Sequence, residues 1–332
     1  MNISRRLLKI FVPVGSLVVT LAVGILVYEI AERYRYDAWR EGFLGSIEWY
    51  GGLTVASKNE VLIYEYRPNF EGKLGGTPIR TNAFGFRDVE RTVQKDSETA
   101  RRYAFIGDSV TLGLKAEFNK IFTRRLEEMQ KRIRIMPHSE YLNFSVDGYD
   151  VLQIREMLKT KVLTFRPDVV IYVISLNDFN FRSGDGGKKH FFKQPTSFFL
   201  RKVDRVLTNL VGFYEYNFWK NERHFWQAVD EMHRVLTEAD LEFVAVIMPV
   251  LSTDSTEYPY SHFHKSISQK LSERNIDSLD LYAALYSGPG APRKNFEDVW
   301  HLSEQGHACV TSVIDEYLQS TAKGVQTSPT VN

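Results

Sequence analysis

The chain has 332 residues, of which 43% are hydrophobic and 25% are charged, and its formal net charge is +1. These values are typical of a globular protein, and the near-neutral charge gives no support to a nucleic-acid partner. The single cysteine, Cys309, excludes an intramolecular disulfide and a cysteine-rich zinc site. We expect Cys309 to be a small core residue in a helix. We expect no metal or cofactor, and the sequence indicates no oligomeric state.

Residues 1–35 are predicted to form a tail and a transmembrane signal anchor. The run from Ile10 to Tyr28 carries no charge, and its length of about 19 residues is close to the roughly 20 that a helix needs to cross a bilayer. A cleaved signal peptide is the rival interpretation, but the apolar region of such a peptide is normally only about 7–15 residues long. A buried core helix is the third interpretation.

Basic residues on the two sides of this run bear on its orientation. Those before the run favour a cytoplasmic N-terminus, and those after it weaken that preference. They are Arg5, Arg6 and Lys9 before the run, and Arg33, Arg35 and Arg40 after it. We therefore predict a single-pass membrane protein whose residues 36–332 lie outside the cytoplasm, in a periplasm or at the cell surface.

Residues 36–100 are predicted to be a juxtamembrane and polar-aromatic lead-in segment. Two of its stretches, Tyr64–Asn69 and Arg80–Asp88, flank a glycine-rich loop. A proline in the first and a glycine in the second favour turns or edge strands over helix. The charged stretch from Arg91 to Arg102 is predicted to be exposed to solvent.

From residue 101 onward, short apolar runs alternate with segments of helical periodicity. The strands are predicted at Tyr103–Ile106, Tyr141–Val146, Asp168–Ser175, Phe243–Met248 and Ile276–Leu281. The helices are predicted at Asn119–Ile133, Val151–Phe165, Glu222–Ala239, Tyr260–Arg274 and Ser303–Ser320, with Ser303 as the N-cap of the last. This alternation indicates an α/β fold with a parallel, doubly wound sheet.

We place this α/β domain at residues 101–322. It contains an insertion at 179–221 that is rich in aromatic and basic residues and shows no clean periodicity. We interpret the insertion as a lid or a wall of the substrate cleft, or as a segment that packs on the edge of the sheet. Residues 323–332 are predicted to be a disordered tail.

Polar residues follow the ends of several predicted strands. Asp108-Ser109 follows the first strand, Asp147-Gly148 the second and Asn177-Asp178 the third, while Asp298-Val-Trp-His301 lies beyond the last. In a doubly wound sheet the carboxyl ends of the strands meet at one edge, where ligands bind. We therefore expect these polar groups to converge there.

These residue types suit acyl transfer. A serine hydroxyl becomes a strong nucleophile when a histidine removes its proton, and a carboxylate orients and stabilises that histidine. Ser109, His301 and Asp298 fit the three roles, because residues three apart in a turn can pair side by side. The N–H groups of Ser109 and Gly148 and the side-chain amide of Asn177 are candidate donors to the oxyanion that forms during the reaction.

In this combination the residues resemble the SGNH hydrolase superfamily, also called the GDSL-type esterases and lipases. Its four sequence blocks match in order, at Gly107-Asp-Ser109, Asn143–Gly148, Ser175-Leu-Asn-Asp178 and Asp298-x-x-His301. The resemblance covers residues from about Arg102 to Leu318, roughly two-thirds of the chain. The segment Thr81–Asp88 is similar to one that precedes the catalytic domain in many exported members.

The resemblance implies a three-layer α/β/α fold of the flavodoxin-like kind and an esterase activity. The site residues that it implies are the nucleophile Ser109, the other triad members His301 and Asp298, and the oxyanion donors Gly148 and Asn177. Ser175 stands where a glycine is usual in the family. We expect this departure to alter the backbone of the loop that presents the amide.

Other interpretations of these residues remain open. Asp147-Gly148 and Asn177-Asp178 are common turn sequences when each is taken alone. His262 and His264 lack the carboxylate or cysteine partners of a metal site, and we expect them in a solvated loop. His307, in the closing helix, is expected to be structural.

We therefore expect a membrane-anchored serine esterase or deacylase that acts on O-acyl esters, chiefly O-acetyl esters, of a carbohydrate or cell-envelope glycan. Its expected partners are this ester substrate and, through the N-terminal helix, the lipid bilayer. The alternatives are an O-acyltransferase of a polysaccharide, a lysophospholipase or lipase, and a catalytically silent envelope-assembly or polysaccharide-binding protein. The intact serine, histidine and aspartate argue against the last of these.

Overall fold

The computed structural model describes residues 3–44, 51–96, 99–132, 138–180, 196–251 and 258–322. The predicted tail at 323–332 lies outside the described residues, and so does part of the predicted insertion, residues 181–195. The chain divides into two compact units, which are Met1–Ile47 with Arg182–Asn217, and Glu48–Phe181 with Phe218–Asn332. The N-terminal helix belongs to the first unit and the central sheet to the second.

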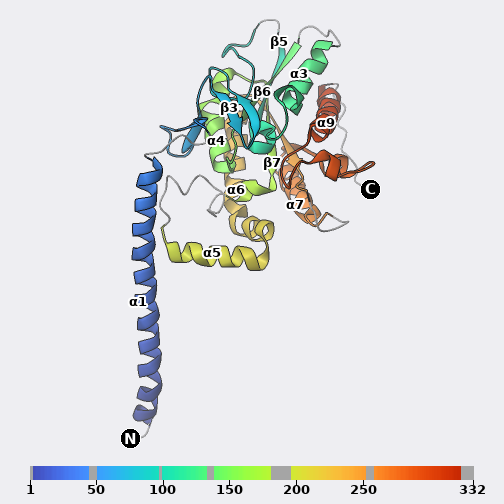
Figure 1. Cartoon of the computed structure of the whole chain (residues 1–332). Helices are drawn as coiled ribbons and strands as arrows, with labels where there is room; N and C mark the ends of the chain where they lie inside the picture. Colours follow the sequence, from blue (N-terminus) through green and yellow to red (C-terminus); the bar gives the residue numbers. More distant parts are fainter. Residues whose placement is uncertain are drawn as a thin grey trace. The chain divides into compact units, whose positions relative to one another are not determined.

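The first unit contains a long helix, α1 (Ile3–Leu44), and a second helix, α5 (Phe198–Val211). Within α1 the stretch Pro13–Ala38 is long and apolar enough to cross a membrane, and its apolar window has a mean hydropathy of 2.1 and no residue buried inside the protein. The expected apolar N-terminal helix is therefore present (Figure 1). Its length and composition suit both a membrane anchor and a signal sequence.

The second unit is built on a sheet of five parallel strands in the order β6-β5-β7-β8-β9. The strands are β5 (Thr99–Gly107), β6 (His138–Ser145), β7 (Val169–Ser175), β8 (Glu242–Met248) and β9 (Asp277–Asp280). After β5 the chain adds β6 on one side and then β7, β8 and β9 in succession on the other. This reversal next to β5 is the switch point at which doubly wound sheets bind their ligands. The predicted parallel, doubly wound sheet is confirmed.

Helices cover both faces of the sheet, which gives the expected three layers (Figure 1). The side chains of Val169, Ile171 and Val173 on β7 join one apolar cluster with those of α3 and α9. On the opposite face the Tyr172 ring lies 6.4 Å from the Phe225 ring of α6, measured between centroids. The bounds of these helices are Phe122–Arg132 for α3, Glu304–Ala322 for α9 and Phe213–Glu238 for α6; α4 (Val151–Thr160) and α7 (Ser261–Ser272) complete the set.

Two small antiparallel pairs of strands precede the central sheet, in the described lead-in segment, residues 51–96. They are β1 (Thr54–Ala56) with β2 (Tyr64–Tyr66), and β3 (Glu71–Leu74) with β4 (Thr77–Arg80). The predicted turns and edge strands of this segment are therefore confirmed.

Short helices lie between the larger elements of the second unit. They are α2 (Ser109–Leu112), η1 (Phe118–Lys120), η2 (Val162–Phe165), η3 (Leu176–Phe179), α8 (Tyr282–Tyr286) and η5 (Arg293–Asn295).

The prediction that the charged stretch from Arg91 to Arg102 is exposed holds for most of the described residues between its ends but was wrong for the two end arginines. Arg102 is fully buried, and its guanidinium donates to the Glu140 carboxylate at 2.6 Å and to the Phe165 carbonyl at 2.5 Å. Arg91 is also buried, in ion pairs with Asp88 and Glu127. A guanidinium is tolerated in the interior when its N–H donors have partners. Glu140, Phe165 and Glu127 lie far away in sequence from the arginines that they contact, whereas Asp88 is only three residues from Arg91.

Several helix boundaries also differ from the predicted ones. α4 ends at Thr160 and a separate 3-10 turn, η2, follows it. α6 begins at Phe213, well before the predicted start, because its first turns carry aromatic residues on several sides and so hide the period. The predicted N-cap of α9 is confirmed, since the Gly306 N–H donates to Ser303 Oγ at 3.1 Å.

Candidate active site

The first site residue lies on a tight turn at the end of β5. Asp108 caps the short helix α2 through its carboxylate, which accepts the N–H of Val110 at 2.9 Å, and Ser109 is the first residue of that helix. Gly107 is required here, because a Cβ on it would come within 2.1 Å of Thr111 Oγ1. The sequence therefore sets Ser109 at the carboxyl end of a central strand, next to the switch point of the sheet.

Ser109, His301 and Asp298 meet as predicted, although the serine and the histidine are far apart in sequence. His301 Nε2 lies 3.0 Å from Ser109 Oγ. The other ring nitrogen, Nδ1, lies 2.9 and 2.8 Å from the two carboxylate oxygens of Asp298. This is the arrangement of nucleophile, base and orienting carboxylate that acyl transfer requires.

The Asp298 carboxylate also shapes the turn that carries the histidine. Its Oδ1 accepts the backbone N–H groups of Trp300 and His301 at 2.9 and 2.8 Å. Partial burial alone would raise the pKa of Asp298, but the hydrogen bonds from the His301 ring and from these two N–H groups outweigh it and hold the pKa below its ordinary value. The carboxylate therefore stays ionised at neutral pH, in the state that stabilises an imidazolium.

A fully buried carboxylate, that of Asp108, connects the serine turn to the loop after β7. Asn177 Nδ2 donates to Asp108 Oδ2 at 2.8 Å, and Ser175 Oγ donates to Oδ1 at 3.4 Å. Burial raises the pKa of Asp108, and its hydrogen bonds from Asn177 and Val110 act in the opposite direction. Sequence reasoning gave Asp108 no separate role, because the groups that contact it belong to a distant strand end.

Asp178, next to the amide, is a structural residue of the same loop. It is completely buried and accepts hydrogen bonds from the Tyr172 hydroxyl at 2.7 Å and from the Ser175 N–H at 3.1 Å. Burial and the nearby Asp108 raise the pKa of Asp178 well above its ordinary value. Its contacts fix the 3-10 turn η3 and thereby the position of the neighbouring amide.

The predicted donor Gly148 lies in the exposed turn after β6, in the left-handed region with φ 75°. β6 pairs with β5 so that Ser145 lies opposite Gly107, which brings this turn to the same edge of the sheet as Ser109. Two tyrosines of β2 hold the turn. The Tyr64 hydroxyl donates to the Asp147 carbonyl at 2.6 Å, and the Asp147 N–H donates to the Tyr66 hydroxyl at 2.9 Å.

Arg87 is a second residue that sequence reasoning missed. It is fully buried, and its guanidinium donates to the carbonyls of Leu112, Gly113 and Ala116 at 3.1, 2.7 and 2.8 Å, and to that of Pro78 at 3.3 Å. Burial lowers the pKa of Arg87 to about 10, so the side chain remains charged at neutral pH. The lead-in segment thus holds the carboxyl end of the helix that begins with Ser109.

The three other histidines that the sequence singled out bond to groups outside the triad. His264 is buried, not solvated as predicted, and it bonds to Asp280 and to the Tyr258 hydroxyl, each at 2.8 Å. His262 bonds to the carbonyl of Pro259. His307 is fully buried and accepts the N–H of Phe122 at 3.3 Å, in agreement with a structural role.

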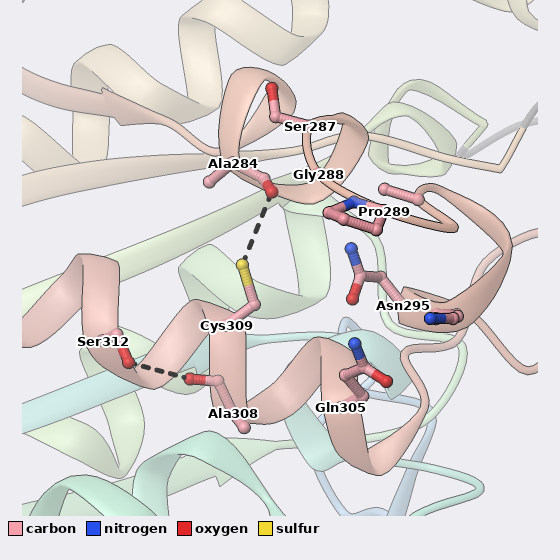
Figure 2. A pocket seen from close by; sticks show the side chains of 11 residues that line it. Ala284, Ser287, Gly288, Pro289, Asn295, Gln305, Ala308, Cys309 and Ser312 are labelled. Atoms are coloured by element: carbon pink, nitrogen blue, oxygen red, sulfur yellow. Dashed lines mark hydrogen bonds between the residues drawn. The ribbon is translucent and has the colours of Figure 1, made fainter.

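Cys309 lines a separate hollow of about 360 Å³ between α8 and α9, which is shown in Figure 2. It packs against the edge of the core from helix α9, as predicted in part, but it is only half-buried. Its thiol donates to the Ala284 carbonyl at 3.5 Å. The triad residues do not line this hollow.

The central part of the chain is similar to known proteins. The model of the GDSL-like lipase/acylhydrolase family matches residues 105–309. No curated protein matches the chain. Similar solved structures include a catalytic mutant of an acetylxylan esterase from Geobacillus stearothermophilus, at 14% identity, with 66% of this chain and 94% of that chain covered and a TM-score of 0.47.

Two further solved structures are similar at the same distant level. A lipase from a goat rumen metagenome is 17% identical, with 65% of this chain and 97% of that chain covered and a TM-score of 0.48. A GDSL-like lipase from Bacteroides thetaiotaomicron is 12% identical, with 67% and 89% covered and a TM-score of 0.42. At these identities the assignment to a family rests on the family model.

Removal of the serine hydroxyl is expected to abolish ester turnover. Ser109→Ala should lower kcat by a factor of about 10⁴ or more, because no other group replaces the nucleophile. Asp298→Asn should cost less than His301→Ala, since the asparagine oxygen still accepts the two turn N–H groups. Steady-state kinetics and thermal unfolding of each variant measure this, with Ser312→Ala, an exposed serine of α9, as the control. Most of the activity surviving in Ser109→Ala would contradict the assignment.

Loss of the Arg87 guanidinium is expected to lower kcat with little change in KM. Arg87→Met leaves buried carbonyls without donors and loosens the turn that carries Ser109, which should cost about 10–100-fold in rate. Arg87→Lys, which keeps the charge and some donors, should lose less. Arg80→Met is the control, because Arg80 forms only an exposed pair with Glu71. An unchanged kcat in folded Arg87→Met would show that this arginine only stabilises the fold.

Proposed function

The chain belongs to the GDSL-like lipase/acylhydrolase family and is an ester-hydrolysing enzyme, and on that premise we propose that it is a membrane-anchored serine esterase. We propose further that it removes O-acyl groups, chiefly O-acetyl groups, from a carbohydrate or cell-envelope glycan. The observation that carries the proposed chemistry is the 3.0 Å contact between His301 Nε2 and Ser109 Oγ, with Asp298 on the other ring nitrogen.

The proposed reaction has two halves. In the first, Ser109 Oγ attacks the ester carbonyl while His301 takes its proton, and the collapse of the tetrahedral intermediate releases the alcohol, which receives that proton from His301. In the second half, a water molecule attacks the acyl-serine and gives its proton to the same imidazole. The collapse of the second tetrahedral intermediate releases the acid, and the imidazole returns that proton to Ser109 Oγ. Asp298 stabilises the imidazolium in both halves.

The oxyanion of each intermediate is proposed to bind at the edge of the sheet where the neighbouring strands β6, β5 and β7 end. Its donors are the N–H groups of Ser109 and Gly148 and the side-chain amide of Asn177. An amide nitrogen carries two hydrogens. One of those on Asn177 Nδ2 bonds to Asp108, which orients the other for the oxyanion.

An exposed aromatic ring next to the triad supports a carbohydrate substrate. Trp300 is 42% exposed, and its ring packs edge-on against His301 with the centroids 6.4 Å apart. A flat apolar surface at that place suits the C–H face of a sugar ring. Tyr64 and Tyr66 of the lead-in segment offer no such surface, because both are buried.

The proposed membrane anchor is the helix α1. Its stretch Pro13–Ala38 has the length and hydropathy of a membrane span, and the side chains in that stretch's apolar window are not buried by the rest of the protein. With the basic residues that precede the uncharged run, this supports a single span and an extracytoplasmic catalytic domain.

We expect the full chain in detergent to hydrolyse short-chain p-nitrophenyl esters and an acetylated glycan, and to turn over long-chain esters poorly. Trp300→Ala should raise KM for the glycan about fivefold, the amount expected for one lost aromatic contact, and should leave KM for p-nitrophenyl acetate unchanged. Trp219→Ala, a change at another exposed tryptophan, is the control.

The same assay separates the alternatives. A preference for long acyl chains would indicate a lipase and contradict the glycan proposal. An unchanged KM for the glycan in Trp300→Ala would contradict the proposed contact between this ring and a sugar. Transfer of the acetyl group to an added sugar in preference to water would indicate an O-acyltransferase. No turnover of any ester would indicate a silent scaffold.

A further inference from the structure

Helix α5 presents an apolar face to solvent. Its large apolar side chains recur at the spacing of a helix, so that they lie along one side, and its charged and polar residues occupy the other side. Leu200 and Leu210 are 63% and 77% exposed. The exposed apolar residues are Leu200, Val203, Val206, Leu207, Leu210 and Val211, and the polar side carries Arg201, Lys202, Asp204, Arg205, Thr208 and Asn209.

The beginning of α5 is fixed to α1 just after the uncharged run of α1 ends. The Glu29 carboxylate accepts the backbone N–H groups of Phe198 and Phe199 at 3.0 and 2.9 Å and the hydroxyl of Ser197, the N-cap residue. Arg33 donates to the Thr196 carbonyl at 2.7 Å. Glu29 directly follows Tyr28, the last residue of that run.

Apolar packing strengthens the same junction. Phe198 is the buried residue of α5 and packs edge-on against Tyr36 of α1, with the ring centroids 5.8 Å apart, while the Arg33 guanidinium lies over the Phe198 ring. α5 then runs crosswise to α1 (Figure 1). A helix that starts at the end of a membrane span and runs across its axis lies along the membrane surface.

We propose that α5 is an interfacial helix whose apolar face inserts into the lipid bilayer that α1 spans. The inference rests on the anchoring part of the proposed function. The polar side carries three basic residues, Arg201, Lys202 and Arg205, and one acidic residue, Asp204, which suits the anionic headgroups of a membrane surface. An apolar face beside a charged, basic one is the pattern of helices that lie in the interface plane.

The bilayer is favoured over a second copy of the chain because the junction itself defines the depth of α5. Glu29, Arg33 and Tyr36 hold the first turn of α5 within about 12 Å of the end of the uncharged run, measured along α1. If α1 spans the bilayer, this position falls at the level of the headgroups, where an apolar face meets acyl chains without any protein partner.

The test places a fluorescent reporter on each side of α5 in the full chain reconstituted into liposomes. Bimane is attached to Leu207→Cys on the apolar face, and to Asn209→Cys on the polar face as the matched control. Both carry Cys309→Ser, since a serine can keep the hydrogen bond to the Ala284 carbonyl. Quenching by brominated phosphatidylcholine reports contact with acyl chains, and quenching by iodide reports contact with water.

We expect loss of fluorescence with brominated lipid at position 207 and not at 209, and the converse with iodide. Equal iodide quenching at both positions would overturn the proposal. Protection of position 207 from iodide without quenching by brominated lipid would also overturn it, because protein would then cover the face.

Alkaline carbonate extraction of the same liposomes tests the anchor separately. If the chain is released, the anchoring part of the proposed function fails. If the chain remains while position 207 is open to iodide, the anchor stands and only the interfacial helix is refuted.

Discussion

The buried carboxylate of Asp108 is the contact on which the candidate site depends most. It caps the helix that begins with Ser109, and it receives the amide of Asn177 from the next strand along the sheet. A buried carboxyl group needs hydrogen-bond partners, and here the donors to it come from the two strand ends that must stay in register for acyl transfer. Because burying Asp108 without these partners would cost free energy, the arrangement that keeps both contacts is favoured. In that arrangement the amide of Asn177, the proposed oxyanion donor, is already in place before a substrate binds.

The lead-in segment extends this arrangement outward. Arg87 holds the end of the serine helix, and Tyr64 and Tyr66 hold the turn with Gly148. Each of these contacts joins a side chain to backbone groups, so that the loops of the sheet edge are fixed from outside the α/β domain. The segment between the N-terminal helix and the sheet is thus part of the framework of the site, and its buried aromatic residues serve packing in place of substrate binding.

Much of the fold was predictable from the sequence, because strands and helices follow local patterns. The meeting of Ser109, His301 and Asp298 was also predictable, from polar residues at strand ends and from the resemblance of four sequence blocks to a known family. Apolar runs such as Val169–Ile174 identify strands, and polar residues directly after them identify the edge where a site forms. Arg87, Asp108 and Arg102 were not predictable in this way. Their partners are carbonyls or side chains far away in sequence, and burial of a charged residue leaves no sign in its own neighbourhood. The exposed stripe of α5 was hidden for a different reason, since aromatic residues on either side of it obscure its period.

The most direct test of the central claim is to identify the residue that reacts as the nucleophile. The full chain is treated with a fluorophosphonate, and the modified peptide is identified by mass spectrometry. A serine activated by a paired histidine forms a stable adduct, because its hydroxyl attacks phosphorus as it would attack an ester carbonyl. We expect one adduct, on Ser109, that forms much more slowly in His301→Ala. An adduct on another serine, or equal labelling of Ser109 without the histidine, would contradict the assignment of Ser109 as the nucleophile.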